Sequence, residues 1–141
     1  MSSDFPGVQG HDSFANKPGL RCYFGNCRSL KNKLPELYQI LYDAHTVYDC
    51  LFFTETWLCS AVPNSLLDPK GEYVVFRKDR GDKVGGGVCA FISKKMRCLD
   101  FDLCNLSADL DIVCFDVMMK TDKYRFIVLY RRPKEGFIRS S

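Results

Sequence analysis

The sequence contains no long hydrophobic run, which limits how the chain can relate to a membrane. Its longest apolar stretches, such as residues 50–53 and 126–130, have about five residues, far fewer than the roughly 20 residues of a membrane-spanning helix. Residues 1–7 have neither a basic start nor an apolar segment, so they do not resemble a signal peptide. We therefore expect no membrane partner and an intracellular location, in the nucleus or the cytoplasm.

Closely spaced metal ligands are also scarce. No Cys-x-x-Cys pair occurs, the nearest spacing being Cys22 to Cys27, and His11 and His45 are the only histidines. These counts argue against a zinc site. The eight cysteines would suggest disulfides in a secreted chain, but most of them lie inside apolar, strand-like runs. We expect reduced cysteines that serve as small core residues.

What is present is the composition of one globular domain. The chain has 141 residues, of which 46% are hydrophobic and 26% charged, with a net charge of +3. The charges are unevenly spread, because an acidic zone at 98–119 lies between basic zones at 70–97 and 120–141. This pattern fits a polyanion-binding rim around a cation site, or simply solvated loops.

The hydrophobic pattern predicts an α/β domain with a mixed sheet and a flanking helix. Residues 1–19 are expected to be a disordered lead, 20–133 the folded domain and 134–141 a tail. A strand at 20–25, a helix beginning near residue 32 and a strand at 48–55 form a βαβ unit with parallel strands. The helical face runs from Leu34 to His45, with Pro35 in the first turn. Later strands, expected to pair antiparallel in one mixed sheet, lie at 73–76, 88–92, 112–117 and 126–130.

Three polar residues stand at the ends of predicted strands. They are Asn26, Glu55 and Tyr130, and ligands of α/β sheets gather beyond the carboxyl ends of strands. A carboxylate beside an amide and a phenol could hold Mg²⁺ and orient a phosphate. Each residue also has a structural interpretation: Asn26 could cap a turn, Glu55 could pair with Arg28, and Tyr130 could be a core aromatic residue.

Two further features near these residues have two interpretations each. The run Gly85-Gly-Gly87 precedes a strand and lacks the Lys-Ser/Thr of a P-loop, so a tight backbone turn is favoured over phosphate binding. Trp57 could stack on a nucleobase or close the hydrophobic core.

Four motifs in order give the chain a resemblance to a known family. They are Asn26-Cys-Arg-Ser-Leu-Lys-Asn-Lys33, Thr54-Glu-Thr-Trp-Leu58, Phe76-Arg-Lys-Asp-Arg80 with Gly85-Gly-Gly-Val88, and Val128-Leu-Tyr-Arg-Arg-Pro133. Together they resemble the first half of the endonuclease domain of LINE-type (non-LTR) retrotransposons. That domain belongs to the endonuclease/exonuclease/phosphatase superfamily, which is deoxyribonuclease-I-like.

The resemblance implies an incomplete four-layer α/β sandwich and Mg²⁺-dependent (or Mn²⁺-dependent) nicking of DNA, with no small-molecule cofactor. It makes Asn26, Glu55 and Tyr130 catalytic residues and Glu55 the metal ligand. A list of nucleic-acid-binding residues follows from the same motifs: Arg28, Arg77, Arg80 and Arg131. The partners implied are DNA and the rest of a nuclease domain or polyprotein.

The chain also departs from the family pattern. The later Gly-Asp-Phe-Asn and Ser-Asp-His segments, which supply the water-activating carboxylate and the catalytic histidine, do not occur in it. The usual Tyr-Arg-Pro-Pro reads Tyr130-Arg-Arg-Pro133. We therefore expect an inactive fragment of such an endonuclease. The alternatives are a non-catalytic mobile-element remnant with at most weak nucleic-acid binding, or a phosphatase relative.

Overall fold

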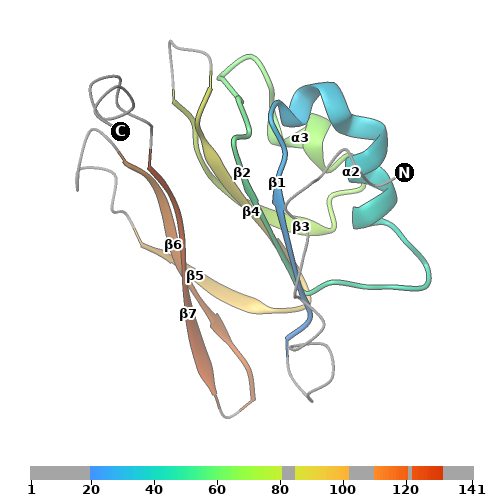
Figure 1. The fold of residues 1–141 in the computed structure, drawn as a ribbon. Coiled ribbons are helices and arrows are strands. Elements are labelled where there is room, and N and C mark those ends of the chain that lie inside the picture. The colour runs from blue at the N-terminus through green and yellow to red at the C-terminus, as the bar shows by residue number, and fades with distance from the viewer. Residues whose placement is uncertain (1–19, 81–84, 102–109, 121, 132–141) are drawn as a thin grey trace.

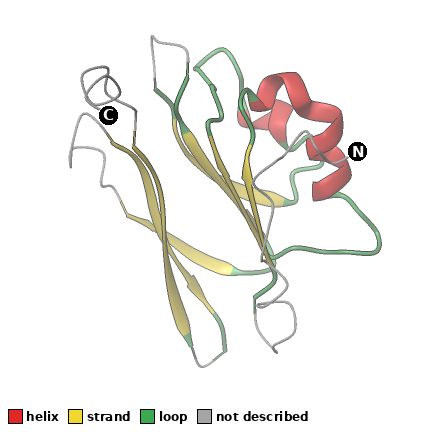
Figure 2. Cartoon of the chain, viewed as in Figure 1, coloured by secondary structure: helices red, strands yellow, loops and turns green. Residues whose placement is uncertain are grey.

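The computed structural model describes residues 20–80, 85–101, 110–120 and 122–131. Two sheets lie face to face, and the helices cover the outer face of the first sheet (Figure 1). The first, sheet A, contains β1 (Cys22–Asn26), β2 (Cys50–Thr54), β4 (Val88–Ser93) and β3 (Tyr73–Lys78), in that spatial order. The second, sheet B, contains β5 (Arg97–Phe101), β6 (Leu110–Met118) and β7 (Lys123–Arg131). The chain is therefore a mixed α/β protein of three layers, and Figure 2 shows these layers by secondary structure.

The opening βαβ unit is confirmed. β1 and β2 pair in parallel with Cys22 opposite Cys50 and Asn26 opposite Thr54. The connection contains a short 3₁₀ helix, η2 (Leu30–Lys33), and α2 (Leu34–Leu41), with Pro35 in its first turn as predicted. Pro35 fits there because the first N–H groups of a helix need no partner within the helix. The helix ends before His45, which is exposed in the loop that follows.

The predicted mixed sheet with a flanking helix is confirmed as sheet A, but the later strands do not all join it. β3 and β4 pair antiparallel as predicted and join the parallel pair, because β4 also pairs antiparallel with β2. β5, β6 and β7 instead form the antiparallel second sheet. β5 and the four-residue helix α3 (Asn64–Leu67) were not predicted, because neither has a strong periodic pattern.

Aromatic side chains join the two sheets. Phe52 of β2 stacks with Phe115 of β6 and lies 5.2 Å, between ring centroids, from Phe126 of β7. Phe115 also meets Phe76 of β3 at 5.3 Å. Phe52 and Phe115 are buried and Phe76 and Phe126 partly so, and buried rings of this size contribute a large share of the hydrophobic stabilisation that holds the sheets together.

The described cysteines are all unpaired thiols, as predicted. Cys27 and Cys89 are completely buried, and burial raises the pKa of Cys27 to about 12 and also raises that of Cys89. Cys59 is only half-buried. In the part of the chain that the structure describes, no helix is both long enough and apolar enough to cross a bilayer.

The differences in burial and thiol pKa among these cysteines predict the order in which they are modified. At pH 8, a pKa of about 12 leaves roughly one Cys27 in 10,000 as the reactive thiolate. We therefore expect iodoacetamide to modify Cys59 at least about 100-fold faster than Cys27 or Cys89. Mass spectrometry of tryptic peptides at successive times measures these rates. Modification of all three at one rate would show that the native protein does not keep this core closed.

Candidate active site

The predicted site lies at the carboxyl ends of β1 and β2, where two loops run side by side. The parallel hydrogen bonding continues past the strands, since the N–H groups of Ser29 and Leu30 donate to the carbonyls of Glu55 and Thr56. Asn26 is opposite Thr54, one residue before Glu55, so the two predicted site residues occupy neighbouring strand ends. Adjacent strands are only about 4.8 Å apart.

Backbone strain is concentrated in these two loops. Arg28, Ser29, Glu55 and Trp57 all have positive φ angles, between 46° and 74°. Residues other than glycine rarely adopt positive φ angles, and such backbone strain is typical of functional sites. The Lys33 ammonium donates to the carbonyls of Cys27 and Arg28, both at 2.6 Å, and so helps to hold the first loop.

The Glu55 carboxylate is held by a tryptophan and by the glycine run. Its Oε1 accepts the Trp57 indole N–H at 2.7 Å and the Gly86 backbone N–H at 3.4 Å. Glu55 forms no ion pair with Arg28 within the described ranges. Its Oε2 accepts no hydrogen bond from any described residue, which leaves one carboxylate oxygen available.

The run Gly85–Gly87 lies against the loop that follows β2 and has the predicted backbone role. Its three φ angles are +95°, +69° and +93°. The Trp57 N–H donates to the Gly86 carbonyl at 3.0 Å, and a Cβ on Gly87 would lie only 2.5 Å from Thr56 Oγ1. Only glycine allows this approach, so the run fixes the backbone on which Glu55 and Trp57 stand.

A buried carboxylate that the sequence analysis missed connects this loop to sheet B. Asp111 is completely buried, and its Oδ2 accepts the Gly87 N–H at 2.9 Å. It stands on β6 directly opposite Tyr130 of β7. Tyr130 therefore lies at the same end of the sandwich as Glu55, although it also packs against the core between the sheets. The sequence held one signal that could have found Asp111. It alternates along β6 with Val113 and Phe115, whose side chains face inward, so the three residues share one face of the strand.

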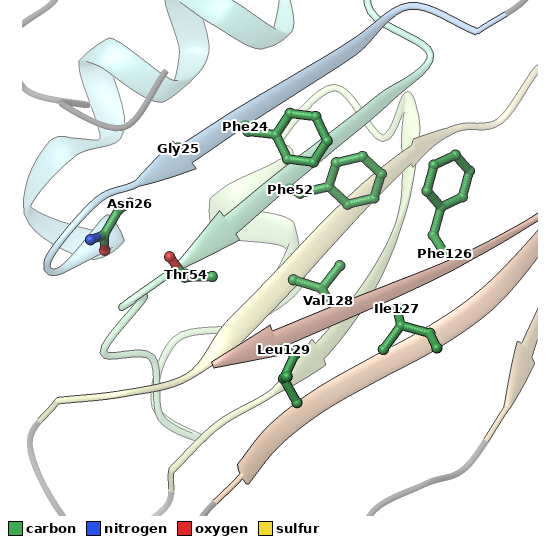
Figure 3. Close-up of a pocket in the computed structure, with 9 residues that line it drawn as sticks. All are labelled: Phe24, Gly25, Asn26, Phe52, Thr54, Phe126, Ile127, Val128 and Leu129. Atoms are coloured by element: carbon green, nitrogen blue, oxygen red, sulfur yellow. The ribbon is translucent and has the colours of Figure 1, made fainter. Parts of the chain in front are cut away.

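Asn26 lies at the mouth of a cavity between the sheets. The cavity has a volume of about 340 Å³, and Asn26 and Thr54 form its polar end, as Figure 3 shows. The rest of the lining is mostly apolar: Phe24, Gly25, Phe52, Phe126, Ile127, Val128 and Leu129. Glu55 does not line this cavity, because its carboxylate is held against Gly86 and Trp57. The candidate site is therefore formed by the carboxyl ends of β1 and β2. These strand ends carry Asn26 and Glu55, and the cavity lies on the Asn26 side.

The four predicted nucleic-acid-binding arginines occupy different settings. Arg28 and Arg131 are exposed, and Arg131 ends β7 beside Asp111 and Tyr130. Arg80 is half-buried and packs against the glycine run, where its Nη1 would lie 3.0 Å from a Cβ on Gly85.

Arg77 instead acts as a structural brace. Its five N–H donors are all used, by Asp79, by Asn64 and by the carbonyls of Cys59 and Val62. No donor is left for a phosphate, so the prediction that Arg77 binds nucleic acid is corrected.

The donor set near Glu55 fits a magnesium ion held by few protein ligands. Among the described residues, no three His, Cys, Asp or Glu side chains gather closely enough to hold a metal. Mg²⁺ commonly uses one or two carboxylates and completes its octahedron with water and substrate phosphate. The available oxygen of Glu55 at a strand end meets that requirement.

Comparison with known proteins supports the fold. The sequence matches no protein-family model and no curated protein. The structure is similar to that of truncated Caenorhabditis elegans TDP2, with a TM-score of 0.51 and 12% sequence identity. The alignment covers 77% of this chain and 43% of that chain, so this chain spans less than half the length of that neighbour. At this identity the likeness shows the fold, which is deoxyribonuclease-I-like.

Proposed function

We propose that the chain carries the metal- and phosphate-binding part of a Mg²⁺-dependent DNA endonuclease of LINE retrotransposon origin, in which Mn²⁺ can replace Mg²⁺. The observation that carries the proposal is the pairing of β1 and β2, which brings Asn26 and Glu55 to one strained edge. The deoxyribonuclease-I-like fold supports a phosphodiesterase scaffold. The motif Thr54–Trp57 together with the glycine run favours a nuclease over a phosphatase.

In this proposal each residue has a distinct role. Glu55 holds the Mg²⁺, which supplies positive charge to the phosphoryl oxygen when it is bound. Asn26 and Tyr130 contribute neutral hydrogen-bond donors to the non-bridging oxygens of the scissile phosphate. Arg28, Arg80 and Arg131 contact flanking phosphates, which gives affinity without choice of sequence.

The groups that complete hydrolysis are not among these 141 residues. The family resemblance assigns water activation and proton donation to motifs that the sequence does not contain. We therefore propose that this chain on its own binds DNA in a Mg²⁺-dependent way without efficient strand cleavage. A non-catalytic remnant is the alternative, and it predicts at most weak binding that does not respond to Mg²⁺.

Fluorescence anisotropy of a labelled DNA duplex tests the proposal. We expect Mg²⁺ to tighten binding to the wild-type chain, and we expect Glu55→Gln to remove at least about 90% of that gain, because glutamine keeps the shape of the side chain without its charge. Glu72→Gln is the matched control, because the exposed Glu72 precedes β3 at the opposite end of sheet A. An equal Mg²⁺ response in the wild type and in Glu55→Gln would remove Glu55 from the site.

Nicking of supercoiled plasmid is measured on the same proteins. We expect the plasmid to stay largely supercoiled with wild type and with Glu55→Gln alike. Efficient Mg²⁺-dependent nicking that Glu55→Gln abolishes would contradict the proposed lack of hydrolytic groups and would make the chain an active nuclease.

A further inference from the structure

The single tryptophan of the chain is exposed beside the candidate site. Trp57 follows Glu55 by two residues, and 39% of it is exposed. Its neighbours in the same loop, Thr56 and Leu58, are only 0% and 2% exposed. Leu58 belongs to the core cluster that also contains Phe53 of β2. Leu58 therefore supplies the core contact of this loop, whereas Trp57 leaves a large part of its ring at the surface.

The indole ring of Trp57 is held in one orientation. Its Nε1–H donates to Glu55 Oε1 at 2.7 Å, and the backbone N–H of Trp57 donates to the Gly86 carbonyl at 3.0 Å. Nε1 also lies 3.9 Å from the position of a Cβ on Gly85, so the nitrogen-bearing edge of the ring faces the carboxylate and the glycine run. A ring that is already oriented loses little conformational entropy when a ligand packs on it.

The faces of this indole have no aromatic or cationic partner among the described residues. Every ring pair and the one ring–cation contact found there involve other side chains. An exposed, oriented aromatic face is a surface on which a flat ligand can stack.

The surroundings of Trp57 favour a nucleotide as that ligand. The loop that follows β1 runs beside Glu55, because the Ser29 N–H donates to the Glu55 carbonyl at 3.0 Å. Arg28, which precedes Ser29 in that loop, is exposed. A basic side chain for the backbone phosphate close to an aromatic ring for the base is the combination found in proteins that bind single-stranded nucleic acid.

Stacking on Trp57 requires a base whose own faces are free. In a regular duplex both faces of a base are covered by the neighbouring base pairs. A single strand, a bulge or a mismatch offers a base that is already partly unstacked, so moving it onto a protein ring costs little. The exposed indole therefore fits DNA that is locally unpaired better than a continuous duplex.

We propose that Trp57 is a stacking site for an unpaired nucleobase of DNA, next to the phosphate that Asn26 and Glu55 bind. This inference rests on the proposed function, because that function brings DNA to these strand ends. Stacking of one base on an aromatic side chain corresponds to about a 5- to 150-fold change in affinity. Since every base has an aromatic face, Trp57 selects an unpaired structure and not a sequence.

Fluorescence of the full chain tests the stacking directly, because its emission at long excitation wavelengths comes from Trp57 alone. We expect a DNA duplex with a central bulge to quench this emission at concentrations at least about fivefold lower than a fully paired duplex of equal length. Free N-acetyltryptophanamide, titrated in parallel, corrects for absorption of light by the DNA. The titration is repeated in EDTA, where the bulged duplex is expected to remain the better quencher.

Two variants of Trp57 separate stacking from the hydrogen bond to Glu55. Trp57→Phe and Trp57→Leu both remove the N–H donor, but only phenylalanine keeps an aromatic face. By anisotropy of labelled DNA, we expect Trp57→Phe to keep a preference for the bulged duplex and Trp57→Leu to bind both duplexes within about twofold of each other. Tyr124→Leu is the control, because Tyr124 is an exposed aromatic residue at the other end of β7 from Tyr130, and it is expected to keep the wild-type preference.

The outcomes distinguish this inference from the proposed function. Equal binding of the two duplexes by the wild type, or equal preferences in Trp57→Phe and Trp57→Leu, would overturn the stacking site even where binding still responds to Mg²⁺. Quenching that favours the bulged duplex without any response to Mg²⁺ would uphold the stacking site and contradict the proposed function. Absence of binding to either duplex would overturn both.

Discussion

Titration with Mg²⁺ is expected to change the fluorescence of the protein. Glu55→Gln is expected to raise the Mg²⁺ concentration at the midpoint of that change at least about tenfold, which corresponds to ~1.4 kcal/mol of binding free energy. Trp57 is the single tryptophan of the chain, and its indole N–H donates to Glu55 Oε1 at 2.7 Å. A cation bound by the same carboxylate changes the charge next to the indole ring. Glutamine keeps an oxygen acceptor there but removes the charge that attracts a hard cation.

The control for this titration is Glu72→Gln, which removes an exposed carboxylate at the other end of sheet A. It is expected to titrate like wild type. A response that survives in Glu55→Gln with the same midpoint would place the cation elsewhere, and no response in the wild type would mean that this edge does not bind Mg²⁺.

Gly87→Ala is expected to lower the free energy of unfolding by about 2–5 kcal/mol, from left-handed backbone strain and from overpacking together. Gly87 has a φ of +93°, and the new Cβ would lie 2.5 Å from Thr56 Oγ1, a fully buried atom. The substitution would also strain the carbonyl and N–H that contact Thr56 and Asp111. Chemical denaturation followed by circular dichroism measures the loss.

Gly71→Ala is the matched control for that prediction. Its φ is +66°, but the nearest atom to its Cβ is Lys94 Nζ at 3.9 Å, so it carries the backbone strain without the collision. We expect a loss of about 1–2 kcal/mol. In Gly87→Ala with Thr56→Ala the collision disappears, and the effects of the two substitutions are expected to be non-additive. Equal losses for Gly87→Ala and Gly71→Ala would show that the loop has room at Gly87.

Local patterns in the sequence were sufficient for the part of the site built on one βαβ unit. The near-continuous apolar run of β2 identified a strand buried on both faces, and its carboxyl end located Glu55 beside Asn26. The glycine run was correctly assigned a backbone role because it lacks the lysine of a P-loop. These inferences needed only residues that are close in sequence or joined by one crossover.

The features that could not be predicted from the sequence depend on contacts between segments that are far apart in the chain. Whether a strand joins sheet A or sheet B is decided by pairing across the whole domain, so the meander was assigned to one sheet. The role of Arg77 depends on carbonyls 15 and 18 residues away, at Val62 and Cys59. Asp111 was counted as part of an acidic zone, and its hydrogen bond to Gly87 shows that it connects the two sheets.

Paramagnetic broadening by Mn²⁺ in nitrogen-15 NMR spectra tests the central claim most directly, namely that the ends of β1 and β2 form one cation-binding edge. We expect the Trp57 indole signal, the Glu55 backbone amide and the Asn26 side-chain amide to broaden together at substoichiometric Mn²⁺. The amide of Ser93, at the opposite end of β4, is expected to stay sharp. Broadening centred on another carboxylate, such as Asp116, while Trp57 and Asn26 remain sharp would contradict the account.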